Sequence, residues 1–166
     1  EDNAEHGLGM YLGQKAIRER LIGKLEAMQP EGEDKAIFDK YLETRDDGKA
    51  NAEAAKALIA LLEKWAADGC EDSKAILAEK DYLAKKSVWI FGGDGWAYDI
   101  GYGGVDHVLA SGEDVNIFVF DTEVYSNTGG QASKASNIGQ VAQFAAAGKV
   151  MPKKSLTEIA MTYGYV

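Results

Sequence analysis

The sequence of 166 residues contains one cysteine, and this scarcity excludes several kinds of protein. A lone thiol, Cys70, cannot form an internal disulfide. One cysteine also cannot by itself hold a zinc ion or an iron–sulfur cluster, because each of these needs several ligands. We therefore expect a fold without covalent cross-links, in the reducing setting of the cytoplasm.

Basic residues and long apolar runs are scarce as well. The 18 Lys and Arg residues are outnumbered by 27 Asp and Glu residues, so the formal net charge is -9 and the pI is near 4.7. Nucleic-acid surfaces need clustered Lys and Arg to neutralise phosphates, so we expect no nucleic-acid partner. No apolar run of about 18 residues occurs, and the N-terminus lacks the order of a signal peptide, so we expect no membrane partner.

The overall composition is typical of a folded globular domain, with 46% hydrophobic and 27% charged residues. Both ends look cut, since the sequence lacks an initiator Met and stops at Val166, directly after a predicted helix end at Gly164. A sheet cut from its neighbours exposes unpaired edges and apolar surface. We therefore expect a piece of a larger chain whose copies associate as a homo-oligomer.

Residues 1–86 predict helices that carry no recognisable chemistry. One helix has an apolar face made of Ile17, Leu21, Leu25 and Met28. A second, Ala-rich helix is predicted to begin at Asn51, a good N-cap residue, and to reach Trp65. A third is predicted to begin at Asp72 or Ser73. The charged residues here have the ordinary interpretation of solvated helix faces.

Residues 87–166 predict an α/β core, within the same structural domain as the helical section. Short apolar runs are typical of strands that are buried on both faces of a parallel sheet. The predicted elements are strands at 87–91 and 115–120, a crossover helix at 96–109, a short helix at 140–147, and a last helix that follows a capping box of Ser155 and Glu158. Trp89, Phe91 and Phe118 are expected in the core.

Polar loops follow both predicted strands. Gly93-Asp94-Gly95 comes after the first, and residues 121–131 come after the second. In a parallel sheet, ligands bind beyond the carboxyl ends of the strands. A carboxylate that opens a helix there would repel a bound phosphate unless a cation lies between them. Mg²⁺ takes about six oxygens, often from one or two protein groups and a ligand's phosphates, so the sequence predicts Mg²⁺ bound through Asp94.

Each loop taken alone has an ordinary interpretation. Gly-Asp-Gly is more often a tight turn than a metal site, and Asn127-Thr128-Gly129-Gly130 alone is typical of a turn. The spacing of the two loops changes this balance, because 25 residues separate Gly95 from Asp121. Thiamine-diphosphate enzymes have a similar motif, in which one or two asparagines stand where Asp121-Thr122 stands here.

With Asp121-Thr122 in place of the asparagines, the sequence resembles the pyruvate:ferredoxin oxidoreductase family, whose members also use flavodoxin. Residues 89–101 and 121–131 are similar to that family almost letter for letter. Glu1 to Gly9 and Met161 to Tyr165 are similar as well, and the resemblance is weakest from about residue 30 to 80. It implies a thiamine-diphosphate-binding fold with a parallel sheet flanked by helices and a helical N-terminal section.

The resemblance also implies roles for individual residues. Asp94, the Thr122 hydroxyl and the Val124 carbonyl would hold Mg²⁺, and Asn127 would face the substrate as the catalytic residue. Contacts to the diphosphate and thiazolium would come from Gly93, Asp94, Gly95, Trp96, Thr122, Glu123, Val124, Tyr125, Ser126 and Asn127. Within this set, Glu123, Tyr125 and Ser126 would serve mainly as loop scaffold.

The full enzyme of such a family converts pyruvate and coenzyme A to acetyl-CoA and passes electrons through iron–sulfur clusters to ferredoxin or flavodoxin. The cluster cysteines and the activating glutamate would belong to the remaining domains of the enzyme. We therefore expect no pyruvate oxidoreductase activity from this chain alone. Two alternatives stay open: a structural or subunit-contact module that binds no cofactor, and a nucleotide-binding domain, which the missing Gly-x-Gly-x-x-Gly disfavours.

Overall fold

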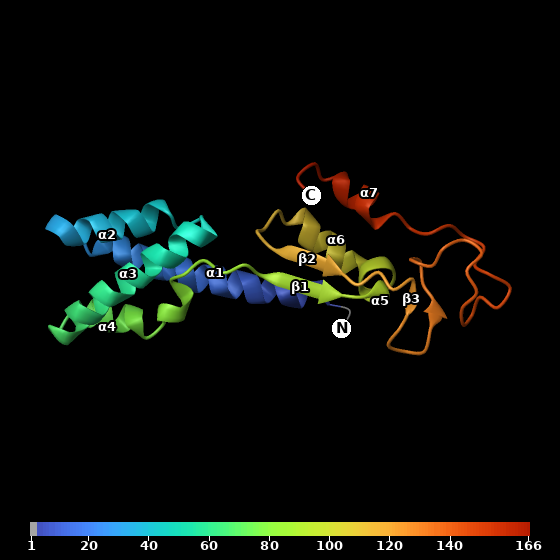
Figure 1. Ribbon diagram of the computed structural model, residues 1–166, viewed down its shortest axis with the longest axis horizontal. Coiled ribbons are helices and arrows are strands. Elements are labelled where there is room, and N and C mark those ends of the chain that lie inside the picture. Colours follow the sequence, from blue (N-terminus) through green and yellow to red (C-terminus); the bar gives the residue numbers. More distant parts are fainter. Residues whose placement is uncertain (1–2) are drawn as a thin grey trace. The chain divides into compact units, whose positions relative to one another are not determined.

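The computed structural model describes residues 3–166, so Glu1 and Asp2 of the N-terminal similarity lie outside the described residues. The chain forms two compact units (Figure 1). One unit is helical and holds Leu12–Ser87; the other holds the described residues up to Tyr11 together with Val88–Val166. No helix of the described part is long and apolar enough to cross a bilayer. The division into sections 1–86 and 87–166 of one domain stays a prediction.

The helical unit packs four helices and one 3₁₀ turn around an apolar core. Its elements are the later turns of α1 (Ala4–Ala27), α2 (Gly32–Glu43), α3 (Gly48–Ala67), α4 (Glu71–Leu77) and η1 (Lys80–Tyr82). The core includes Leu21, Leu25, Phe38, Tyr41, Leu58, Leu62, Ile76 and Leu83. The predicted apolar face of α1 supplies part of this core, as the spacing of its residues indicated.

The predicted N-cap at Asn51 is wrong. Asp47 caps α3, because its carboxylate accepts hydrogen bonds from the backbone N–H groups of Lys49 and Ala50 at 3.0 and 2.9 Å. Asn51 is fully buried inside α3, where its Oδ1 accepts from the backbone N–H of Lys85 at 2.7 Å. The next helix, α4, likewise begins earlier than predicted, with Cys70 at its N-cap.

The other unit is α/β, which confirms the predicted fold class. Its elements are β1 (Trp89–Gly92), α5 (Asp94–Tyr98), α6 (Tyr102–Ala110), β2 (Asn116–Val119), β3 (Val124–Tyr125), β4 (Gln131–Ala132) and α7 (Leu156–Met161). Strands β1 and β2 pair in parallel, with Trp89 opposite Asn116 and Gly92 opposite Val119. Both strands therefore end at the same edge, which brings the two polar loops together.

The predicted crossover helix is two helices, because the chain turns sharply between α5 and α6. At this turn Gly101 lies against the backbone of Trp96: a Cβ on Gly101 would stand 2.7 Å from the Trp96 carbonyl oxygen. Such an approach requires a residue without a side chain. The glycine therefore allows the chain to fold back closely over α5.

The two faces of the β1–β2 pair differ in burial. Ile90 is buried against the first turns of α1 and against α6, in a core with Leu8, Trp96 and Val105. The opposite face carries four aromatic side chains that are about half exposed, and we name it the aromatic face: Trp89 (51%), Phe91 (58%), Phe118 (44%) and Phe120 (53%). Their rings contact one another, with centroids 5.0 to 6.2 Å apart. The prediction that these strands are buried on both faces is therefore wrong for the described chain.

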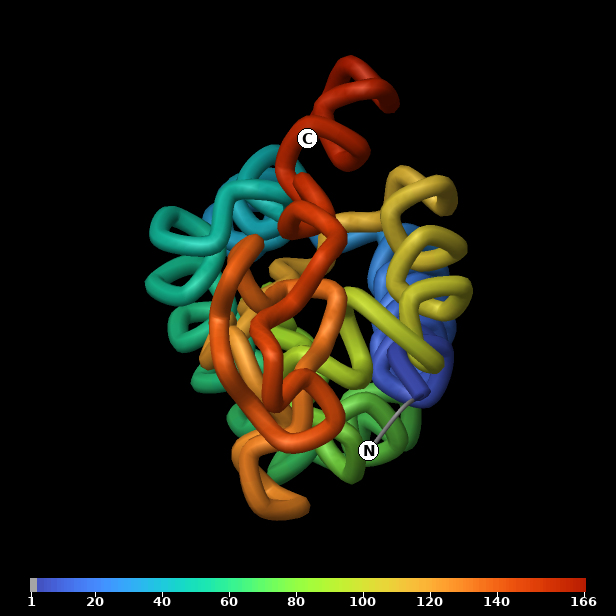
Figure 2. The backbone as a smooth tube through the Cα atoms, turned by 90° about the vertical axis from the view of Figure 1, so that its right-hand side faces the viewer, coloured from blue at the N-terminus to red at the C-terminus, as the bar shows by residue number. Residues whose placement is uncertain are grey.

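The segment between Asp121 and Ser155 contains no helix, and Figure 2 follows it as the orange to red tube. The helix predicted at residues 140–147 is wrong, because this stretch makes strand-like contacts instead. Gln143 donates to the Gly130 carbonyl at 3.1 Å and accepts from the Ala132 N–H at 2.9 Å. At Ser155, the start of α7 has no side-chain capping bond, so the predicted capping box is wrong as well.

Candidate functional site

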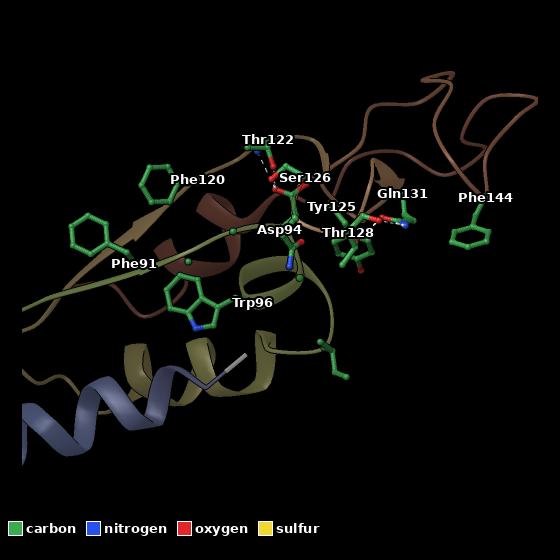
Figure 3. A pocket seen from close by; sticks show the side chains of 15 residues that line it. Phe91, Asp94, Trp96, Phe120, Thr122, Tyr125, Ser126, Thr128, Gln131 and Phe144 are labelled. Atoms are coloured by element: carbon green, nitrogen blue, oxygen red, sulfur yellow. Dashed lines mark hydrogen bonds between the residues drawn. The ribbon is translucent and has the colours of Figure 1, made fainter. Parts of the chain in front are cut away.

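A cavity of roughly 910 Å³ lies at the carboxyl ends of β1 and β2 (Figure 3). Its lining residues are Phe91, Gly92, Gly93, Asp94, Gly95, Trp96, Ile100, Phe120, Thr122, Tyr125, Ser126, Asn127, Thr128, Gln131 and Phe144. In Figure 3 the rings of Phe91 and Phe120 lie at one end and Phe144 lies at the other, with Asp94 and Thr122 between them. This volume is in the range of sites that hold small ligands and cofactors.

Asp94 is the buried carboxylate of this cavity. It is the first residue of α5, and only 3% of its surface is exposed. Its Oδ1 accepts from the Thr122 backbone N–H at 3.0 Å and lies 3.4 Å from the Thr122 hydroxyl. Its Oδ2 accepts from the Ser133 hydroxyl at 2.8 Å. A buried charge needs such partners, because burial without them costs several kcal/mol.

Three oxygens form a cluster in which a cation can be held. The Thr122 hydroxyl lies 3.4 Å from Asp94 Oδ1 and 2.9 Å from the Val124 carbonyl oxygen. Neighbouring oxygens around octahedral Mg²⁺ stand about 3 Å apart, since each lies about 2.1 Å from the ion. The described residues contain no group of three His, Cys, Asp or Glu side chains that could hold a metal. A cation here would therefore need further oxygens from water or from a ligand, which is the ordinary arrangement for Mg²⁺.

The neighbouring Asp121 has other partners. Its Oδ2 accepts from the Lys153 ammonium at 2.6 Å and from the Tyr98 hydroxyl at 2.8 Å. Partial burial of Asp121 acts to raise the pKa of its carboxyl, but the hydrogen bonds from Lys153 and Tyr98 outweigh it and lower the pKa. Burial and the Asp121 carboxylate together raise the pKa of Tyr98 well above its usual value. This ion pair anchors the loop just before Thr122.

Trp96 supports the floor of the cavity. The residue is 3% exposed, and its ring packs directly on Gly92, where a Cβ would stand 2.2 Å from two ring atoms. Only glycine at this strand end leaves room for the indole. Trp96 therefore belongs both to the core and to the cavity lining.

The structure places eight of the ten predicted cofactor-binding residues in the cavity lining. The eight are Gly93, Asp94, Gly95, Trp96, Thr122, Tyr125, Ser126 and Asn127. Val124 contributes its carbonyl beside the Thr122 hydroxyl. Glu123 lies apart from the lining: its carboxylate is 3.8 Å from the Lys153 ammonium, and its backbone has a left-handed φ of 64°.

Sequence reasoning missed two buried serines beside the site. Ser133 and Ser136 are 4% and 0% exposed. Ser133 donates to Asp94, and the Ser136 hydroxyl donates to the Glu123 carbonyl. Nothing in the segment Ser133-Lys134-Ala135-Ser136 distinguishes it from an ordinary polar loop, so no sequence signal indicated these contacts.

Comparison with known families bears directly on this cavity. Residues 69–166, well over half of the chain, match the family described as "Thiamine pyrophosphate enzyme, C-terminal TPP binding domain". The chain belongs to this family. The match includes every residue that lines the cavity and both serines beside it.

The likeness to known proteins extends over the whole of this chain. The chain is 49% identical to the pyruvate-flavodoxin oxidoreductase of Klebsiella pneumoniae and 50% identical to the pyruvate:ferredoxin oxidoreductase of Moorella thermoacetica. It is 43% identical to the mitochondrial pyruvate dehydrogenase [NADP(+)] of Euglena gracilis. Each comparison covers all of this chain but only 14%, 15% and 9% of those proteins, respectively. The resemblance to the pyruvate:ferredoxin oxidoreductase family is confirmed.

Proposed function

We propose that this chain binds thiamine diphosphate together with Mg²⁺ and serves as the cofactor-holding part of a pyruvate:ferredoxin or pyruvate:flavodoxin oxidoreductase. The observation that carries the proposal is the oxygen cluster of Asp94, Thr122 and Val124 at the edge of a cofactor-sized cavity. One buried carboxylate beside two neutral oxygens suits an ion whose other ligands come from a diphosphate. The family match supports the assignment of thiamine diphosphate, and the names of the relatives support the assignment to a pyruvate oxidoreductase.

Each group of the chain then has a specific task. Asp94, the Thr122 hydroxyl and the Val124 carbonyl hold the ion, while the backbone from Gly93 to Trp96 faces the diphosphate. The thiazolium of thiamine diphosphate supplies the carbanion chemistry that decarboxylates a 2-oxo acid. Asn127 lines the same cavity and is proposed to face the pyruvate substrate.

The remaining steps need groups outside this sequence. Electron transfer to ferredoxin or flavodoxin through iron–sulfur clusters requires several cysteine ligands, and the chain has only Cys70. Transfer of the acetyl group to coenzyme A is likewise assigned to the complete enzyme. We therefore propose that the chain by itself does not reduce an electron acceptor with pyruvate, and a pyruvate-dependent dye-reduction assay on the purified chain would reveal such activity if it existed.

Calorimetric titration tests cofactor binding directly. Thiamine diphosphate is titrated into the chain with Mg²⁺ present, and into the variants Asp94→Asn and Asp94→Ala. Because Asp94 is the single carboxylate of the oxygen cluster, we expect both variants to lose at least about 100-fold in affinity. Asp46→Ala is the matched control, since its side chain is 83% exposed in the helical unit. Equal affinity in all four proteins would refute the assignment of the ion to Asp94.

The aromatic face favours one second candidate function. Four half-exposed aromatic side chains on one sheet face are typical of a surface that contacts another protein. If the unmodified, folded chain binds no thiamine diphosphate at any Mg²⁺ concentration, a subunit-contact module is the better description.

A further inference from the structure

The second oxygen of the Asp94 carboxylate is held by a serine from a distant part of the chain. Ser133 Oγ lies 2.8 Å from Asp94 Oδ2, and both residues are more than nine-tenths buried. The Ser133 hydroxyl also accepts from the Ala135 N–H at 3.0 Å. A hydroxyl has a single proton, so this second contact leaves the proton for the carboxylate.

The position of Ser133 is itself fixed by a tight turn. Its backbone N–H donates to the Ser136 hydroxyl at 2.9 Å, and Ser136 in turn donates to the Glu123 carbonyl. The Lys149 ammonium closes the turn from the other side by donating to the Ser136 carbonyl at 2.6 Å. A buried hydroxyl with this support keeps one orientation.

The two oxygens of Asp94 therefore face different partners. Oδ1 lies beside the Thr122 hydroxyl, in the oxygen cluster, whereas Oδ2 is engaged by Ser133. A carboxylate that binds an ion through both oxygens must present both to it. Ca²⁺ commonly binds carboxylates in this way, with six to eight ligands at longer distances, while Mg²⁺ requires a near-ideal octahedron.

We propose that Ser133 is a positioning residue that restricts Asp94 to binding through Oδ1 and thereby makes the site selective for Mg²⁺ over Ca²⁺. The inference rests on the proposed function, because it concerns the same ion. It adds the source of selectivity, which lies in a hydrogen bond to the ligand's far oxygen. Groups that orient metal ligands in this way commonly change affinity by about 10- to 100-fold when removed.

The test compares two metals in the unmodified chain and in Ser133→Ala. Mg²⁺ and Ca²⁺ are each titrated calorimetrically at a fixed, saturating concentration of thiamine diphosphate. Ser133→Ala leaves Oδ2 without its donor, so we expect Mg²⁺ affinity to fall by about tenfold or more while Ca²⁺ affinity changes little. Ser73→Ala is the matched control, because it also removes a fully buried serine hydroxyl, but in the helical unit.

The ratio of the two affinities separates the possible outcomes. An unchanged ratio in Ser133→Ala, with both metals weakened equally, would mean that Ser133 is only structural and would overturn the inference but not the proposed function. Failure of the unmodified chain to bind either metal with thiamine diphosphate would overturn both. If circular dichroism shows that Ser133→Ala is unfolded, Ser133→Cys keeps the size and a weak donor, and an intermediate shift in the ratio is then expected.

Discussion

Gly92 is predicted to be the least replaceable glycine of the β1–β2 edge. A Cβ at this position would stand 2.2 Å from two ring atoms of Trp96 and 2.7 Å from a third. Neither Gly92 nor Trp96 has room to move, because the Gly92 carbonyl accepts from the Phe120 N–H at 2.7 Å and Trp96 is only 3% exposed. Overpacking of a rigid core costs typically 1–3 kcal/mol, so we expect Gly92→Ala to lose about 3 kcal/mol of unfolding free energy.

Urea denaturation of the two proteins measures this loss. Gly103→Ala is the control, because a Cβ added at Gly103 would meet nothing within 4 Å beyond its own helix, α6. An alanine in a helix is expected to raise the stability by up to about 1 kcal/mol relative to glycine. In a Trp96→Leu background the clash is relieved, and the cost of Gly92→Ala should fall below about 1 kcal/mol. A Gly92→Ala protein whose stability is within about 0.5 kcal/mol of the original would refute the steric reasoning.

Two further predictions concern the surface and the ion pair of the α/β unit. Burial of the exposed half of one aromatic ring removes about 100 Å² of apolar surface from water and stabilises an association by about 2.5 kcal/mol. The double variant Phe91→Gln, Phe118→Gln should therefore have a self-association constant at least about tenfold lower, as sedimentation experiments would measure. Folding lowers the pKa of the Asp121 carboxyl below its ordinary value of 3.8. The ionised carboxylate therefore stabilises the fold at pH values above 3.8, and this stabilisation is lost as the pH falls from 3.8 through the lowered pKa. Lys153→Met should therefore lose less stability than the original chain in that acid range, as thermal unfolding at a series of pH values would measure.

A specific outcome would contradict each of these two predictions. A chain that sediments as a monomer at high concentration would show that the aromatic face does not drive association between copies. For the ion pair, Lys56→Met is the control, since Lys56 pairs with Glu53 where both side chains are more than 70% exposed. If the stability of Lys153→Met and that of this control fall equally as the pH is lowered, the hydrogen bond from Lys153 to Asp121 does not determine the loss of stability in acid.

The proximity of Asp94 and Thr122 was predictable from sequence. Each follows a short apolar run, and two parallel strands that pair in register end at the same edge. The glycines around Asp94 gave a local signal as well, since a close approach of backbone to other groups requires them. Local spacing and one topological rule were therefore sufficient for this part of the site.

Contacts made by distant segments were not predictable. The bond from Ser133 to Asp94 and the ion pair from Lys153 to Asp121 depend on the course of a long segment without helices. The exposure of Phe91 was missed for another reason: an apolar run shows that a strand has apolar faces, but not that a neighbour within the same chain covers both. The start of α3 was predicted wrongly because Asn51 is a residue type typical of an N-cap, whereas the carboxylate of Asp47, four residues earlier, caps the helix.

The hydrogen bond from Ser133 to the Asp94 carboxylate has a consequence for biosynthesis. Asp94 is translated 39 residues before Ser133, so the acid leaves the ribosome well before the hydroxyl that fixes its outer oxygen. Released chains truncated after residue 130 would carry all three oxygens of the proposed ion site but would lack the serine that hydrogen-bonds to Asp94. We expect such chains to retain Mg²⁺ and thiamine diphosphate poorly compared with chains that extend through residue 150, so that stable cofactor capture requires the segment that contains Ser133.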